Sequence, residues 1–400
     1  MPDPVTILAI SSYFKGDAFL RQCKREGCRV FLLTEEKLAH ENWPRASLDN
    51  LFLMPDLSRL QDVIHAVSYL FRSTAVDRII PLDEYDVETA AALREHLRLP
   101  GPGQTATRFF RDKLAMRMKT REAGILVPDF TPVFNYDRLR DYLGRIPPPW
   151  LLKPRTEAGA MGIKKIHQAE ELWRWLDQLG DRQSYFLLEH YVPGDVFHVD
   201  SIIWDGSIRF ASVQKYGQPP MNVAHDGGIF TTRTLIPDDA DAQALLALNA
   251  QVVQALEIRR GIAHAEYIKA HADGRLYFLE CAARVGGAHI ADLIEASRGL
   301  NLWAEWARLE IASVREQPYQ LPALKQLHSG LLVSLARQER PDTSAYADPE
   351  VVWRLDKQHH AGLIVVSESY DRVTQLLEDY TQRFITDFLA IQPPKDKPTN

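Results

Sequence analysis

Short apolar runs alternate with amphipathic helical patterns in the first part of the chain. This β-α-β order predicts a parallel sheet in a Rossmann-like α/β domain. The turn after the first strand, Ser11 to Gly16, lacks the glycine fingerprint of dinucleotide-binding folds, so NAD binding is not expected. The predicted strands are Val5 to Ile10, Cys28 to Thr34 and Arg78 to Leu82, and the predicted helices are Asp17 to Arg25 and Val87 to Leu97.

The pattern changes to short strands in the middle of the chain. Asp112 can cap a helix that runs to Ala123, and Gly124 follows it. The strands after it are closely spaced and several are joined by turn pairs, which predicts antiparallel pairing. They are Trp150 to Pro154, Ile163 to Ile166, Tyr185 to Tyr191, Val196 to Trp204, Ile208 to Gln214 and Ile229 to Leu235, followed by a helix at Asp239 to Leu256, a hairpin at Gly261 to Ala282 and helices from about Ile290 to Ala312.

A small α+β unit is predicted from Pro322 onward. It has strands at Leu331 to Leu335 and Leu363 to Val366 and a helix at Tyr370 to Leu389. The tail Gln392 to Asn400 has no large apolar residue and is expected to be disordered. The predicted organisation is an N-terminal domain at 1–105, a core at 106–320 with subdomains 106–186 and 187–320, a C-terminal lid at 321–391 and the tail at 392–400.

Composition narrows the class of partner. The chain has 47 Lys and Arg against 53 Asp and Glu, so nothing draws it to nucleic acid or to an anionic membrane, and small-molecule partners are expected. Its 3 cysteines show no metal-ligand spacing, which favours a reducing compartment. The run Val5 to Ile10 is too short for a signal segment or a bilayer span, so a cytoplasmic location is expected.

Two carboxylates in one predicted hairpin are the strongest chemical signal. A three-residue loop Ala272-Asp273-Gly274, with Gly274 left-handed, places Glu266 directly opposite Glu280, whereas a two-residue Asp273-Gly274 turn places them on opposite faces. Opposed carboxylates repel unless a cation lies between them, and Mg²⁺ takes one or two carboxylates together with phosphate oxygens. The hairpin therefore predicts a magnesium site, in preference to solvated surface glutamates. The same alternation places His264 and Ala282 on the metal face, and Tyr267 and Cys281 on the other.

Two further segments follow predicted strands. Lys153 ends a strand, and the small residues from there to Gly162 let backbone N–H groups approach phosphates. No Gly-Lys-Ser/Thr ends this segment, so it is not a Walker loop, and a Gly-containing hairpin turn would look the same. The strand and turn from Leu187 to Asp195 could offer backbone groups to a base and an acid to a ribose, but by itself it is an ordinary strand end.

In this order and spacing the three features resemble the ATP-grasp superfamily, over roughly Phe109 to Leu300. The resemblance implies an ATP-grasp fold, α/β and α+β, in which two subdomains clamp ATP between an N-terminal Rossmann-like domain and a C-terminal lid. It also implies ATP and Mg²⁺ as cofactors. It assigns ATP binding to Lys113, Lys153, Thr156, Gly159, Gly162, Glu189, His190, Val192 and Asp195, and metal binding to Glu266 and Glu280.

Two positions depart from the family pattern. Ala282 stands where a metal-binding Asn is usual, which leaves the number of metal ions open. Asp195 is offset from the usual ribose-binding acid, which leaves Asp200 as a rival.

The segment Arg284 to Ile290 is similar to the carboxylate-amine ligase branch, which includes L-amino acid ligases. The resemblance implies that Arg284 faces phosphate and acyl oxygens, and that Gly286 and Gly287 leave room for a substrate. His289 is either a substrate contact or, as slightly favoured, a helix-start residue that contacts only backbone. Gly228, in His225-Asp226-Gly227-Gly228, belongs either to a substrate loop or to a plain β-turn.

The implied activity is the ATP-dependent joining of a carboxylate, such as an amino acid, to an amine. An acyl phosphate would form first and ADP and phosphate would be released, with Arg284 and Lys153 as the catalytic residues. A bicarbonate-using carboxylase-type enzyme is one alternative, and a degenerate nucleotide-binding regulator, suggested by Ala282, is another. The identities of the acid and amine are left open, as is the oligomeric state, with a homodimer among the options.

Overall fold

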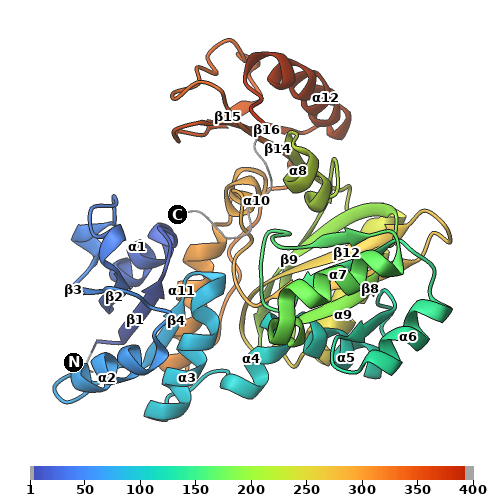
Figure 1. Cartoon of the computed structure of the whole chain (residues 1–400). Helices are drawn as coiled ribbons and strands as arrows, with labels where there is room; N and C mark the ends of the chain where they lie inside the picture. Colours follow the sequence, from blue (N-terminus) through green and yellow to red (C-terminus); the bar gives the residue numbers. More distant parts are fainter. Residues whose placement is uncertain (1–3, 392–400) are drawn as a thin grey trace.

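A computed structural model describes residues 4–391 and places three β-sheets one after another along the chain (Figure 1). The tail predicted to be disordered, 392–400, lies outside the described residues. Among the helices that the structure describes, none is both long enough and apolar enough to span a membrane.

The first sheet is parallel and has the strand order β3-β2-β1-β4, as expected for a Rossmann-like domain. The residues of β1 are buried on both faces, which explains its continuous apolar run. The sequence analysis did not predict β3, which is a half-exposed edge strand, or α2, whose buried residues are Val63 and Val67. The elements are β1 (Thr6–Ser11), α1 (Asp17–Arg25), β2 (Arg29–Glu35), β3 (Asn50–Met54), α2 (Leu60–Leu70), β4 (Arg78–Pro81) and α3 (Val87–Leu97), with 3₁₀ turns at Glu36–Leu38, Arg45–Ser47 and Glu84–Asp86.

The second sheet is antiparallel, with the order β5-β8-β6-β7. The predicted cap of α5 is present, because the Asp112 carboxylate accepts a hydrogen bond from the N–H of Leu114 at 3.0 Å. The elements are α4 (Gln104–Arg111), α5 (Lys113–Glu122), β5 (Phe130–Pro132), α6 (Tyr136–Arg145), β6 (Trp150–Pro154), β7 (Lys164–Ile166), α7 (Ala169–Leu179), a 3₁₀ segment (Gly180–Tyr185) and β8 (Phe186–His190).

The third sheet has eight strands in the order β13-β12-β9-β10-β11-β14-β16-β15. The predicted C-terminal α+β segment is present, and its strands extend this sheet because β14 pairs with β11. In Figure 1 this part, with α12, lies at the top of the molecule. The elements are β9 (Gly194–Trp204), β10 (Ser207–Tyr216), α8 (Pro220–Asp226), β11 (Phe230–Thr234), α9 (Ala240–Ala255), β12 (Gly261–Ala270), β13 (Leu276–Ala282), α10 (Ile290–Arg298), α11 (Leu302–Val314), β14 (His328–Leu335), β15 (Val351–Arg354), β16 (His360–Ser367) and α12 (Tyr370–Asp387).

The N-terminal domain packs against α11. The rings of Phe19 and Trp306 meet edge to face with centroids 5.7 Å apart, within an apolar core that both parts share. Beside this core, the buried carboxylate of Glu310 lies 3.4 Å from Arg78 Nε and 3.3 Å from Arg260 Nη2. Strand β4, whose C-terminal end faces the site described below, is therefore held against the larger sheet.

The hairpin of β12 and β13 pairs Glu266 directly with Glu280, as predicted, but for a different reason. The loop is not three residues long, because Ala270 and Arg275 still hydrogen-bond across it at 2.9 Å and Gly274 N–H donates to the Ala270 carbonyl. The register shifts between Glu266 and Tyr267, where Phe278 is paired and Leu279 is skipped as a β-bulge. The bulge, and not the loop, brings the two carboxylates onto one face. Gly274 is left-handed, with φ 69°, as expected.

Candidate functional site

A cavity of about 350 Å³ lies between the second and third sheets. Its volume is in the range of small-molecule sites, and its wall combines apolar side chains with charged groups from the second and third sheets, from α5 and from the turn after β4. The predicted site residues that line it are Lys113, Lys153, Gly159, Glu189, His190, Val192, Glu266, Glu280, Arg284 and Gly287. The apolar residues that line it include Phe110, Met116, Leu151, Ile163, Val196, Phe230, Leu279 and Ile290.

The two opposed carboxylates have different partners. Oε1 of Glu266 accepts a hydrogen bond from the Tyr216 hydroxyl at 2.8 Å, whereas Oε2 of Glu280 lies 3.0 Å from Lys113 Nζ. Burial opposes ionisation of Glu266, but its contacts with His264 and Tyr216 lower the pKa of this carboxyl overall. Both carboxylates line the cavity, and their donor set is oxygen only. Glu266 and Glu280 therefore fit a hard divalent cation such as Mg²⁺.

Lys153 is held at the cavity by a buried ion triad. Its Nζ lies 2.5 Å from Oε1 of Glu189, whose Oε2 accepts from Arg117 Nε at 2.9 Å. Burial alone would raise the pKa of Glu189, but the charges of Arg117 and Lys153 lower it. The carboxylate of Glu189 is thus paired with two cations from the first subdomain, and it holds Lys153 at the cavity wall.

Backbone contacts narrow the segment that was assigned to the base. The N–H groups of His190 and Tyr191 already donate to the carbonyls of Asp129 and Pro149, at 2.7 and 3.0 Å. These two N–H groups are therefore occupied. Val192 is the next residue along the chain and lines the cavity, so its backbone is the one in this segment that can face a base.

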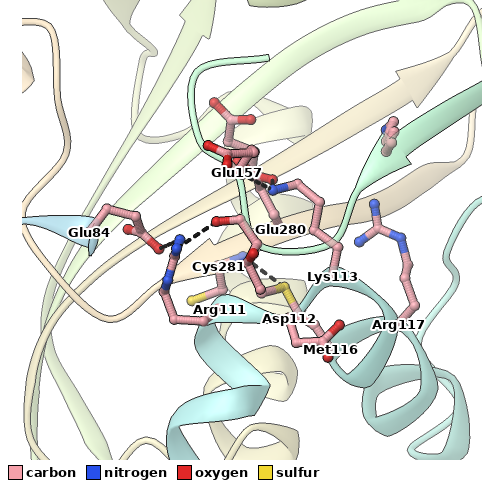
Figure 2. Close-up of polar contacts among 12 residues, drawn as sticks. Glu84, Arg111, Asp112, Lys113, Met116, Arg117, Glu157, Glu280 and Cys281 are labelled. Carbon is pink, nitrogen blue, oxygen red and sulfur yellow. Dashed lines mark hydrogen bonds and ion pairs between the residues drawn. The ribbon is translucent and has the colours of Figure 1, made fainter. Parts of the chain in front are cut away.

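The segment after β6 folds over the cavity and is tied to α4 and α5. Lys113 Nζ donates to the carbonyl of Glu157 and Arg111 Nη2 to the carbonyl of Thr156, each at 2.5 Å. Figure 2 shows these cations pointing toward the segment from below. Gly159 and Gly162 both have positive φ, at 64° and 67°, a conformation that favours glycine because it has no Cβ. Such a segment can present backbone N–H groups to a phosphate.

Glu84, from the N-terminal domain, joins the site through two arginines. Its Oε1 accepts from Arg111 Nη1 at 2.7 Å (Figure 2). Its Oε2 accepts from Arg284 Nε at 2.5 Å. All three side chains are largely buried. Arg284, which the sequence assigned to phosphate and acyl oxygens, is therefore oriented by a carboxylate that follows β4.

This ion cluster predicts an acid-dependent loss of stability. Burial would raise the pKa of Glu84, but Arg284 and Arg111 lower it to about 2. Because the unfolded chain binds this proton more readily, the stabilisation is complete above about pH 4.5 and is lost as the pH falls toward 2. The difference in free energy of unfolding between the parent and Glu84→Gln should therefore shrink from about pH 5 to about pH 3 in urea titrations. The control is Glu122→Gln, at an exposed position. If the free energy of unfolding relative to the parent changed with pH equally in both variants, this account would be contradicted.

A buried network lies behind Glu266. Asp200 lies between the rings of His198 and His264, at 2.7 and 2.9 Å from their Nδ1 atoms. Burial disfavours a charged His264, yet the Asp200 carboxylate raises the pKa of His264 to about 10. The pKa of Asp200 is lowered by the two imidazoles, against the opposing effect of burial. His264 lines the cavity, whereas His198 and Asp200 lie beneath its wall.

Several predicted site residues lie away from the cavity wall. Asp195 pairs with Lys215 at 2.7 Å, and neither Asp195 nor the buried Asp200 lines the cavity. His289 does not contact backbone alone, because its Nδ1 lies 2.9 Å from the Asp292 carboxylate and its ring lies beside Trp353. The other predicted residues outside the lining are Thr156, Gly162, Gly228 and Gly286.

Sequence reasoning missed Glu84, Arg111, Arg117 and Tyr216. Each carries a polar group that is buried against charged partners from a distant element. No spacing motif marks them. The available signal was a charged residue inside an otherwise buried pattern, as with Glu84 just after the apolar strand β4.

Comparison with known proteins finds similar sequences and similar folds. Residues 146–292 match the family described as the ATP-grasp domain. The L-arginine-specific L-amino acid ligase of Bacillus subtilis is 28% identical over 64% of this chain, and the match spans 62% of that protein's length. The crystal structure of an L-amino acid ligase from Bacillus licheniformis superposes with a TM-score of 0.77 over 98% of this chain and 99% of that one, at 16% identity.

A likeness at this level of identity shows the fold, and other enzymes share it. The N5-carboxyaminoimidazole ribonucleotide synthetase of Thermus thermophilus superposes with a TM-score of 0.71 over 97% of this chain and 100% of that one, at 17% identity. The residues that match the family, 146–292, include most of the predicted site residues that line the cavity. Residues 146–292 of this chain match the ATP-grasp domain, and the whole chain shares the fold of that L-amino acid ligase structure.

Proposed function

We propose that this protein is an ATP-dependent carboxylate-amine ligase that activates an amino acid or a related acid as an acyl phosphate. The observation that supports it most directly is the convergence of Glu266, Glu280, Lys153 and Arg284 on one cavity. Two carboxylates suit a cation, a lysine suits a phosphate, and a buried arginine suits a planar oxyanion. The match to an L-amino acid ligase supports an amino acid as one substrate.

In this proposal the nucleotide base occupies the apolar part of the cavity, beside Val192, Val196 and Leu279. The phosphates lie beneath the segment around Gly159, near Lys113 and Lys153. Mg²⁺, held by Glu266 and Glu280, would neutralise charge on the phosphate oxygens.

The substrate carboxylate would lie beside Arg284. One of its oxygens attacks the γ-phosphorus of ATP, the bond to the β-γ bridging oxygen breaks, and ADP leaves. Lys153 and Arg284 stabilise the charge that develops on the transferring group. An amine then attacks the acyl carbon, loses a proton, and displaces phosphate. The segment over the cavity would keep water from the acyl phosphate.

The products test this proposal. Turnover should give ADP and phosphate in equal amounts, without AMP and pyrophosphate, because attack is at the terminal phosphorus. With the correct acid and with hydroxylamine in place of the amine, a hydroxamate should form. An acid-by-amine matrix scored for phosphate release, with mass spectrometry of the positive wells, identifies the substrates.

Other outcomes would contradict the proposal in different ways. AMP as the stoichiometric product would rule out the acyl phosphate. ATP cleavage that needs bicarbonate and no amino acid would point to a carboxylase-type enzyme. Tight ATP binding without turnover on any pair would indicate a nucleotide-binding regulator.

A further inference from the structure

Asp200 and His264 lie directly opposite each other on the paired strands β9 and β12. The Asp200 carboxylate joins His264 to His198, and the far nitrogen of His198 lies 2.9 Å from the hydroxyl of Thr232. His198 and Asp200 are 0% exposed. The network thus runs across three strands, and only its His264 end reaches the cavity.

These side chains form a hydrogen-bonded unit and not a metal site of their own. Possible ligand atoms of His198, Asp200 and His264 lie within 4.8 Å of one another. However, each Asp200 oxygen already lies 2.7 or 2.9 Å from a ring nitrogen, which is the distance of a direct hydrogen bond. The carboxylate is therefore used to orient the two rings.

The unit has two neighbours in the site. On one side, Nε2 of His264 lies 3.7 Å from Oε1 of Glu266, the same oxygen that accepts from Tyr216. On the other side it packs against the backbone of Gly286. A Cβ added at Gly286 would lie 2.8 Å from an Asp200 oxygen and 3.0 Å from His264 Nδ1, so nothing larger than glycine fits unless the pair moves.

Contacts with Tyr216 and His264 converge on Oε1 of Glu266, which leaves Oε2 as the oxygen to face a cation. Contacts from residues that are not themselves ligands fix ligand carboxylates and strengthen metal binding. We propose that Asp200 and His264 form a positioning unit that fixes the Glu266 carboxylate on one side and the Gly286 backbone on the other. It thereby links cation binding to the placement of Arg284, which precedes Gly286 in the same loop. This inference rests on the proposed function in taking Glu266 as a metal ligand.

The affinity for Mn²⁺ in the presence of ADP, followed by electron paramagnetic resonance of the free ion, tests this unit without turnover. His264→Asn keeps a donor toward Asp200 but removes the group beside Glu266, and should weaken Mn²⁺ binding by about 10- to 100-fold. His264→Gln, whose amide can reach the position of Nε2, should lose less. Gly286→Ala should weaken binding in the same direction, although Gly286 offers no ligand.

Tyr267→Phe is the matched control. It removes a buried hydrogen bond to Asn249, at 2.8 Å, from the residue next to Glu266 on the other face of β12. Its Mn²⁺ affinity should equal that of the parent. Unchanged affinity in folded His264→Asn, or an equal loss in Tyr267→Phe, would overturn the positioning role and leave the ligase proposal standing. A parent that binds no Mn²⁺ with ADP would remove the metal assignment from both proposals.

Discussion

Glu280→Gln should lower turnover by several orders of magnitude while the protein stays folded. The substitution removes one of the two opposed carboxylates and therefore much of the charge that attracts a divalent cation. The Glu280 side chain is 34% exposed and its contact with Lys113 is an ion pair at the cavity wall, so little folding energy depends on it. Phosphate release with the correct acid and amine measures the effect, and thermal unfolding confirms the fold.

Glu257→Gln provides the comparison for this variant. It also breaks an ion pair with a lysine of α5, Lys119, at 2.7 Å, but on the exposed surface away from the cavity. Its rate should match that of the parent. Near-normal turnover of Glu280→Gln at saturating magnesium would mean that Glu280 is merely structural.

Arg284→Lys should reduce kcat by about 10²- to 10³-fold and change the KM for ATP little. Lysine preserves the positive charge next to Glu84, so the buried carboxylate keeps a partner and the fold is retained. It loses the planar fork that can donate to Glu84 and to an acyl or phosphate oxygen at the same time. Loss of one donor to developing charge has an effect of this size.

Steady-state kinetics, with the concentrations of ATP and acid varied separately, distinguish an effect on kcat from an effect on the KM for ATP. The control is Arg315→Lys, because Arg315, at the C-terminal end of α11, pairs with Glu26 of the N-terminal domain and does not line the cavity. A kcat equal to that of the parent would show that Arg284 only holds Glu84. A large rise in the KM for ATP with unchanged kcat would place Arg284 in nucleotide binding instead.

Local patterns were enough to predict most of the elements. The apolar runs of β1 and β4, the Asp112 cap and the alternation along β12 are set by neighbours in the chain, because burial and strand periodicity act over a few residues. For the same reason, Lys153 at a strand end and the pair Glu266 and Glu280 could be recognised from the sequence. Their roles in ATP and metal binding stay predictions that the experiments above address.

Tertiary structure decided what those residues face. The bulge at Leu279, which depends on how two strands pair, brings Glu280 opposite Glu266. Glu84 reaches Arg284, 200 residues further along the chain, because the N-terminal domain packs against α11. Asp200 meets His264 because β9 pairs with β12. Such contacts join groups that share no local pattern, since their energy comes from desolvated charges that pair only when distant elements are packed together.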